Sequence, residues 1–158
     1  MAENVPAALR TLIEKQELVV SRQQVTDAKM SLHALAHRLR ADGPWQSLLP
    51  GVYLTVTGTP RREQREMAAL LYGGPGAVIT GSAALRYRGV TLPESDTIDI
   101  LISEKGRRQS TSFVAVHRTT QVPKTPIVRG ERLYAPDARA VADAARLMTD
   151  LREVRALV

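Results

Sequence analysis

The chain has 158 residues, with 22 Lys and Arg against 16 Asp and Glu, so its formal net charge is +6 and its pI is about 10.2. It contains no cysteine, which excludes a disulfide scaffold, a thiol nucleophile and a thiolate zinc site. The basic surplus favours a polyanionic partner, nucleic acid first. No apolar run approaches the roughly 20 residues of a membrane span, and the N-terminus lacks a signal-peptide pattern. We therefore expect a cytoplasmic protein with no membrane partner.

Two clusters of helix-breaking residues precede the midpoint of the chain. Residues 58–62 read GTPRR, and residues 72–77 read YGGPGA. We place the domain joint at the first cluster. This predicts an N-terminal domain over residues 1–58 and a C-terminal domain over residues 59–158.

Three short helices and a hairpin are expected in the N-terminal domain. Ser21 and Ser31 each stand where a hydroxyl can cap the helix that follows. Pro50-Gly51 separates two β-prone runs, which predicts a hairpin. The expected elements are helices over 6–16, 22–28 and 32–40 and strands over 45–49 and 52–56. Three short helices followed by a hairpin are typical of a winged helix-turn-helix.

The third helix is the most informative element, because its helical spacing divides it into two sides. We expect a buried side made of Leu32, Leu35, Ala36 and Leu39. We expect an outward side made of His33, Ala34, His37 and Arg38.

A helix with such an outward side fits the major groove of DNA, where Arg can read guanine and His can contact bases or phosphates. We expect His33, His37 and Arg38 to contact base edges. Trp45 is expected to cover the helical core. The residues expected on the phosphate backbone are Ser21, Arg22, Gln23, Arg40 and Gln46.

No metal or other cofactor is expected. His33 and His37 stand at the i, i+4 spacing of a zinc-binding pair, but Ala34 occupies the position of the glutamate in HExxH. No third ligand is evident except His117, far along the chain.

The C-terminal domain is expected to be a small α+β domain. The predicted elements are helices over 62–71 and 82–88, strands over 77–80, 97–102, 112–118 and 127–134, and a final helix from Pro136. We expect this helix to continue through Met148, Leu151 and Val154 toward the end of the chain, because no glycine stops it. Its apolar face could pack internally or meet another protein.

The stretch GSAALRYRGVTLPESDTIDILI partly resembles a nucleotidyltransferase motif, in which a Gly-Ser turn precedes two metal-binding carboxylates. Asp96 and Asp99 are three positions apart and would project to opposite faces of a strand. We therefore expect no catalysis. A degenerate nucleotidyltransferase using Ser82, Asp96 and Asp99 stays as an alternative.

A basic cluster lies between two of the predicted strands. It consists of Lys105, Arg107 and Arg108. Such a cluster can bind a second track of phosphates, bind an acidic protein, or only keep a sheet edge soluble. The sequence leaves these three readings open.

Four stretches in order resemble the AbiEi-type antitoxin family of type IV toxin–antitoxin systems. They are LVVSRQQV, WQSLLPGVYL, REMAALLYGGPGAVITGSAALRYRGV and RLYAPDARAVADAAR. The resemblance implies a DNA-binding repressor that autoregulates its operon at inverted repeats. It implies that the C-terminal region neutralises a cognate nucleotidyltransferase-like toxin, and that this chain has no catalytic activity. Carried over by position, DNA contact falls on Ser21, Arg22, Ser31, His33, His37, Arg38 and Arg40 and on the hairpin around Gln46.

The sequence thus predicts an α+β protein with an N-terminal winged helix-turn-helix, acting as a sequence-specific transcriptional regulator on double-stranded DNA. Specificity would come from two half-sites, bound by a homodimer or by cooperating monomers. The alternative is a protein-interaction antitoxin module in which DNA binding is secondary.

Overall fold

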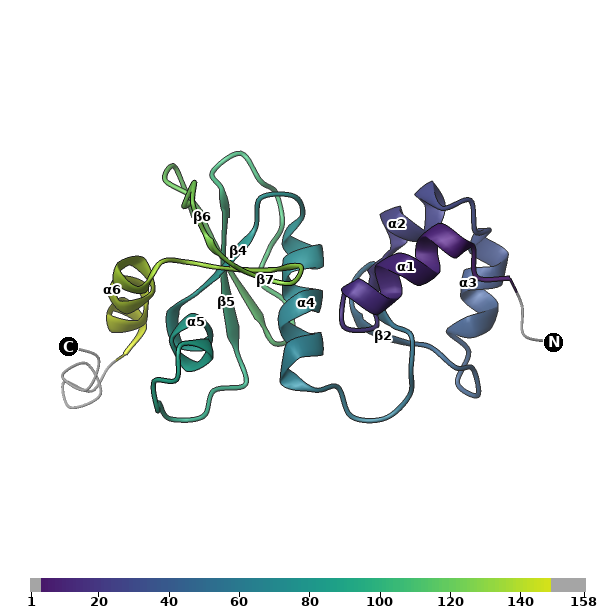
Figure 1. The fold of residues 1–158 in the computed structure, drawn as a ribbon, viewed down its shortest axis with the longest axis horizontal. Helices are drawn as coiled ribbons and strands as arrows, with labels where there is room; N and C mark the ends of the chain where they lie inside the picture. The colour runs from purple at the N-terminus through teal and green to yellow at the C-terminus, as the bar shows by residue number, and fades with distance from the viewer. Residues whose placement is uncertain (1–3, 149–158) are drawn as a thin grey trace. The chain divides into compact units, whose positions relative to one another are not determined.

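The computed structural model describes residues 4–148 and divides the chain into two compact units, residues 1–72 and 73–158 (Figure 1). Its described part contains six helices and two sheets, which confirms the expected α+β class. The sequence analysis placed residues 59–72 in the C-terminal domain, whereas this division places them in the first unit. These residues include most of helix α4 (Arg62–Gly73). No helix within residues 4–148 combines the length and the apolar character needed to cross a membrane.

The first unit combines three helices with a small antiparallel sheet. Its elements are α1 (Ala7–Lys15), β1 (Val19–Ser21), α2 (Arg22–Asp27), α3 (Leu32–Arg38), β2 (Gln46–Leu49) and β3 (Val52–Leu54). The strand order is β1-β3-β2, so the last strand in the sequence is central. The three helices and the β2–β3 hairpin occur where the sequence predicted them. Strand β1 was not predicted, because a run of three residues becomes a strand only through its pairing with β3.

A single core joins these elements. Buried residues come from all three helices, from β1 and β3 and from the short connections, which ties each element to the others. The core consists of Leu9, Val20, Val25, Met30, Leu35, Trp45 and Tyr53. Helix α3 is too short to be stable by itself. The packing of Leu35 in this core therefore holds the helix in place.

A tight turn links α2 to α3. Lys29 adopts a left-handed conformation with φ 66°, and its N–H donates to the Thr26 carbonyl at 2.9 Å. The N–H of Met30 donates to the Val25 carbonyl at 3.2 Å. These two bonds form a Schellman motif, in which glycine is the usual left-handed residue. The turn ends α2 sharply and places Ser31 at the start of α3.

The second unit is built on a mixed five-stranded sheet. Its elements are β4 (Val78–Thr80), α5 (Gly81–Tyr87), β5 (Ile98–Ser103), β6 (Val114–Thr119), β7 (Ile127–Arg129), β8 (Arg132–Tyr134) and α6 (Asp137–Leu147). The strand order is β6-β5-β4-β8-β7. Strand β4 is antiparallel to β5 and parallel to β8, and β5 is parallel to β6. Helices α5 and α6 lie side by side on one face of this sheet (Figure 1).

Two expectations for the second unit are wrong. The strand predicted over residues 127–134 is a hairpin of β7 and β8, because Gly130 turns the chain with φ 58°. The final helix does not continue through Met148, whose ψ of 134° is extended. The positions predicted to follow on that helix, Leu151 and Val154, lie outside the described residues.

Candidate nucleic-acid interface

Helix α2 begins at a capping box. The Ser21 hydroxyl accepts a hydrogen bond from the Gln24 backbone N–H at 3.2 Å, and the Gln24 side chain accepts one from the Ser21 backbone N–H at 3.0 Å. The Gln24 amide also donates to the buried Gln16 amide at 2.7 Å. The hydroxyl of Ser21, which was expected on the DNA backbone, therefore holds the start of α2 in place.

Two exposed residues occupy the first turn of α2. The backbone N–H of Arg22 donates to the Gly51 carbonyl at 2.8 Å, so this turn lies beside the turn of the β2–β3 hairpin. The Gln23 amide donates to the Asp27 carboxylate at 2.8 Å, one helical turn further along. Arg22 therefore supplies the positive charge at this end of the helix, next to the hairpin.

Helix α3 is also capped by a serine, since the Ser31 hydroxyl accepts a hydrogen bond from the Ala34 backbone N–H at 3.1 Å. Its buried side is rotated from the predicted one. Ala34 packs against the core, whereas Leu32 is 48% exposed and Ala36 is exposed. The predictions that Ala34 faces outward and that Leu32 and Ala36 face inward are therefore wrong. The core side of α3 consists of Ala34, Leu35 and Leu39.

The outward side of α3 carries His33 and His37, and Arg40 follows just after the helix. The Arg40 guanidinium Nη2 lies 2.8 Å from His37 Nε2, and Arg40 Nε donates to the His37 carbonyl at 3.3 Å. A guanidinium has only donors, so in this contact the Arg40 group can only donate toward the His37 ring. We call His33, Ala36, His37 and Arg40 the α3 face. Its three polar members are exposed, as the sequence predicted for both histidines.

Arg38 does not share this face. It is half-buried, and its guanidinium carbon lies 5.4 Å from the centre of the Trp45 ring. Trp45 is buried in the core of the first unit, which confirms its predicted position. Cations over indole rings are stabilised by the ring quadrupole, by about 0.5–1 kcal/mol or more. The predicted outward orientation of Arg38 is therefore wrong, and its contact with a base edge stays a prediction.

Gln46 fastens the hairpin to the chain that leaves it. Its side-chain amide nitrogen donates to the carbonyls of Val56 at 3.0 Å and Gly58 at 2.8 Å. Both amide protons are thus used within the unit. The structure gives Gln46, expected on phosphates, a structural role that its sequence position did not reveal.

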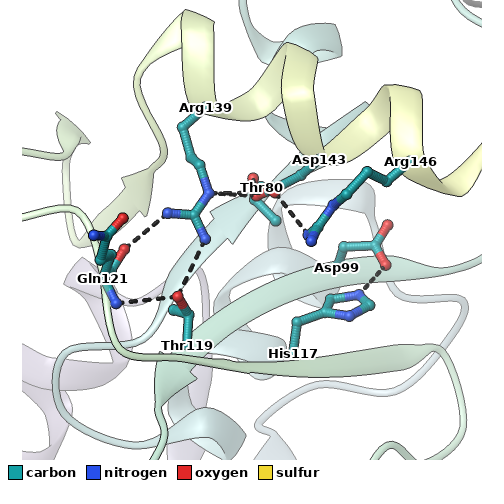
Figure 2. A network of polar contacts seen from close by, with 8 residues as sticks. All are labelled: Thr80, Asp99, His117, Thr119, Gln121, Arg139, Asp143 and Arg146. Carbon is teal, nitrogen blue, oxygen red and sulfur yellow. Dashed lines mark hydrogen bonds and ion pairs between the residues drawn. The ribbon is translucent and has the colours of Figure 1, made fainter.

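A second group of polar side chains lies in the second unit, centred on Asp143 of α6 (Figure 2). This carboxylate is only 5% exposed, and it accepts hydrogen bonds from the Thr80 hydroxyl at 2.7 Å, Arg139 Nε at 3.0 Å and Arg146 Nη2 at 2.9 Å. Arg139 also donates to the Gln121 carbonyl at 2.8 Å. Asp143 therefore joins α6 to the end of β4, and the sequence analysis missed it.

Asp99 and His117 form a further pair on neighbouring strands (Figure 2). His117 Nε2 lies 2.8 Å from Asp99 Oδ1, across the parallel strands β5 and β6. The other oxygen of Asp99 lies beside Gly81, where an added Cβ would be 3.5 Å away. Thr80 also pairs with Asp99 across β4 and β5, so the Gly-Ser pair at the start of α5 and the Asp99 carboxylate are adjacent.

The residues of the nucleotidyltransferase alternative are only partly assembled. Asp99 lies within β5, as predicted, and Asp96 is exposed before the strand begins. Residues 4–148 contain no group of three or more His, Cys, Asp or Glu side chains that could hold a metal ion. No protein-family model matches the chain, and no curated protein matches it in sequence.

Proposed function

We propose that this protein is a sequence-specific, DNA-binding transcriptional regulator whose first unit acts as a winged helix-turn-helix. One observation carries the proposal: α2 and α3 are joined by the tight turn at Lys29, anchored in one core and followed by a hairpin, with the α3 face exposed. Helix-turn-helix proteins use the second helix of such a pair to enter the major groove.

The exposed side chains divide between the two kinds of contact that DNA recognition needs. His33 and the His37–Arg40 pair lie on the α3 face, and we assign them to base edges and to the phosphates that flank them. Arg22 lies beside the Gly51 turn of the hairpin, and we assign it to the phosphate backbone. Arg38 holds the end of α3 against Trp45, and its contact with a base edge stays a prediction.

The capping and packing contacts support this proposal through rigidity. A side chain that reads DNA must be held close to its working position by the residues around it. Ser21, Ser31 and Gln46 provide such support here, because each one fixes an end of α2, α3 or the hairpin. The resemblance to AbiEi-type antitoxins adds an expected target, an inverted repeat in the protein's own promoter, read as two half-sites.

The test is binding of the full chain to duplex DNA from upstream of its own gene, against a scrambled duplex of equal length, at two salt concentrations. We expect a preference of roughly a thousandfold or more at physiological salt. Arg40→Gln should weaken binding by about 1–3 kcal/mol, whereas Arg10→Gln, the same charge change on α1, should have little effect. Equal, salt-sensitive binding to both duplexes, or no binding, would overturn the proposal.

A protein-binding role for the second unit is the second candidate, supported by two exposed apolar side chains. Val128 on β7 is 63% exposed and Leu147 at the end of α6 is 50% exposed. A cognate nucleotidyltransferase-like toxin is the partner that the family resemblance suggests. Co-purification with the product of the neighbouring gene tests it, and a complex that survives both Val128→Ser and Leu147→Ser would show that neither side chain is needed for binding.

A further inference from the structure

The loop between β5 and β6 concentrates positive charge on the second unit. We call residues 104–110 the basic loop. Lys105, Arg107 and Arg108 are all exposed, and Glu104 is the only acidic residue of the loop. Three cations within four successive positions make this one of the most strongly basic segments of the chain.

The basic loop is held in a defined shape by a residue from the neighbouring strand. Arg118 of β6 donates from Nε to the Gly106 carbonyl at 2.8 Å and from Nη2 to the Arg108 carbonyl at 2.7 Å. At the far end, the Ser110 hydroxyl accepts a hydrogen bond from the Val116 N–H at 2.9 Å. The guanidinium of Arg118 therefore fixes the backbone on both sides of Arg107.

Gly106 brings the loop close to the sheet. A Cβ at this position would lie 2.7 Å from Cδ1 of Ile102, a buried residue of β5, and 3.1 Å from the Ser103 carbonyl oxygen. The Gly106 N–H also donates to that carbonyl at 2.9 Å. Packing on one side and the Arg118 bonds on the other leave the loop little freedom, so its cations stand on an ordered support.

Two of these cations are not neutralised within the described structure. Among residues 4–148, the side chains of Lys105 and Arg107 have no ion-pair partner. Other arginines of this unit are paired, as Arg88 is with Asp137 at 3.1 Å. Because its backbone is already fixed, the loop loses little backbone entropy when its cations bind an anion. Arginine in addition matches the geometry of phosphate oxygens with two parallel hydrogen bonds.

We infer that the basic loop binds the phosphate backbone of duplex DNA as a second contact, independent of base sequence. The inference rests on the proposed function, because DNA is the polyanion that the first unit is proposed to bind. Lys105 and Arg107 make the contact, and Arg118 is a positioning residue that holds the loop. The loop adds affinity and salt dependence, and it adds no preference between sequences.

The experiment uses the full chain with the double substitution Lys105→Gln and Arg107→Gln, and measures affinity for upstream and scrambled duplexes of about 30 base pairs, long enough for two half-sites. Each lost phosphate contact lowers the slope of log affinity against log salt by about 0.9, so the slope should fall by about 2. Between 50 and 200 mM salt, the wild type should then lose about tenfold more affinity than the variant. Both duplexes should change alike.

A matched control removes two exposed cations from elsewhere on the same unit, with Lys124→Gln and Arg129→Gln. If this control lowers the slope equally, the effect is one of net charge and the inference is overturned. An unchanged slope for the Lys105/Arg107 variant also overturns the inference. The proposed function would still stand in that case if Arg40→Gln lowers the preference for the upstream duplex. Poly-glutamate serves as a probe for an acidic protein. If the Lys105/Arg107 variant loses binding to poly-glutamate while its DNA binding is unchanged, the inference is overturned and the loop is assigned to an acidic protein.

Arg118→Lys separates positioning from charge. It keeps the positive charge but cannot donate to both the Gly106 and Arg108 carbonyls from one planar group. We expect a smaller salt slope with the thermal midpoint nearly unchanged, since Arg118 is exposed. A wild-type slope in this variant would show that the loop's shape does not matter to binding.

Discussion

Replacing Asp143 with asparagine removes the charge at the centre of the polar cluster in the second unit and keeps nearly the same volume. The carboxylate accepts hydrogen bonds from Thr80, Arg139 and Arg146 at 2.7–3.0 Å. An asparagine oxygen can still accept some of these bonds. Its NH₂ group, however, would face guanidinium groups, which have only donors. The variant therefore tests how much α6 depends on this buried charge.

The expected loss of stability follows from the exposure of each partner. The Thr80 bond is buried and contributes about 1 kcal/mol. The bond from Arg139, whose side chain is mostly buried, is charge-assisted and contributes about 1.5–2 kcal/mol. Arg146 is 69% exposed, so solvent screens its ion pair and we assign it less than about 0.5 kcal/mol. The asparagine oxygen can keep the Thr80 bond, so we expect Asp143→Asn to lower the free energy of unfolding by about 2 kcal/mol, mainly through the Arg139 bond.

Urea unfolding followed by far-UV circular dichroism measures this loss, and amide hydrogen exchange shows whether it falls on β4 and α6. Asp137→Asn is the matched control, because it makes the same change on the same helix at an ion pair with Arg88 that is about half exposed on both sides. We expect the control to cost less than about 0.5 kcal/mol. Equal losses in the two variants, or a loss below about 1 kcal/mol at Asp143, would refute the reasoning.

Three further predictions concern the first unit. Lys29→Gly should raise the free energy of unfolding by up to about 1 kcal/mol, because glycine accepts the left-handed turn without strain; a fall in urea midpoint would contradict this. Ser21→Ala and Ser31→Ala should each cost about 1 kcal/mol through lost helix caps, measured in the same titration. Leu32→Ala should cost under about 0.5 kcal/mol and Leu35→Ala about 2–5 kcal/mol; a loss of about 2 kcal/mol or more for Leu32→Ala as well would restore the side of α3 predicted from sequence.

Local chemistry explains why the helices of the first unit were predictable. Ser21 and Ser31 are followed by short apolar patterns, and each caps its helix through a backbone N–H three residues on. Such signals need no knowledge of the rest of the fold. The hairpin was predictable for a similar reason, since Pro50-Gly51 interrupts two β-prone runs. Gly51 has φ 71°, which suits a turn.

The features that were missed depend on residues far apart in the sequence. Leu32, Leu35 and Leu39 suggest one apolar side for α3, but the core that packs on the helix meets Ala34 in place of Leu32. Trp45, which draws Arg38 inward, lies beyond the helix itself. Thr80 and Asp143 are 63 positions apart, so nothing local marks them as partners. Spacing within a helix predicts that it has two sides, and the tertiary partners decide which side is buried.

The pairing of β1 with β3 should become more stable when a ligand binds to α3. Val19 pairs with Leu54, so this contact closes a chain loop that contains all of α2 and α3. Closing a flexible loop of this length costs about 3 kcal/mol of chain entropy. A ligand that binds only the folded unit raises the free energy needed to open the β1–β3 pairing, by an amount set by its binding free energy. Slower amide exchange at the β1–β3 hydrogen bonds would therefore report that α3 is occupied, even though neither strand lies on α3.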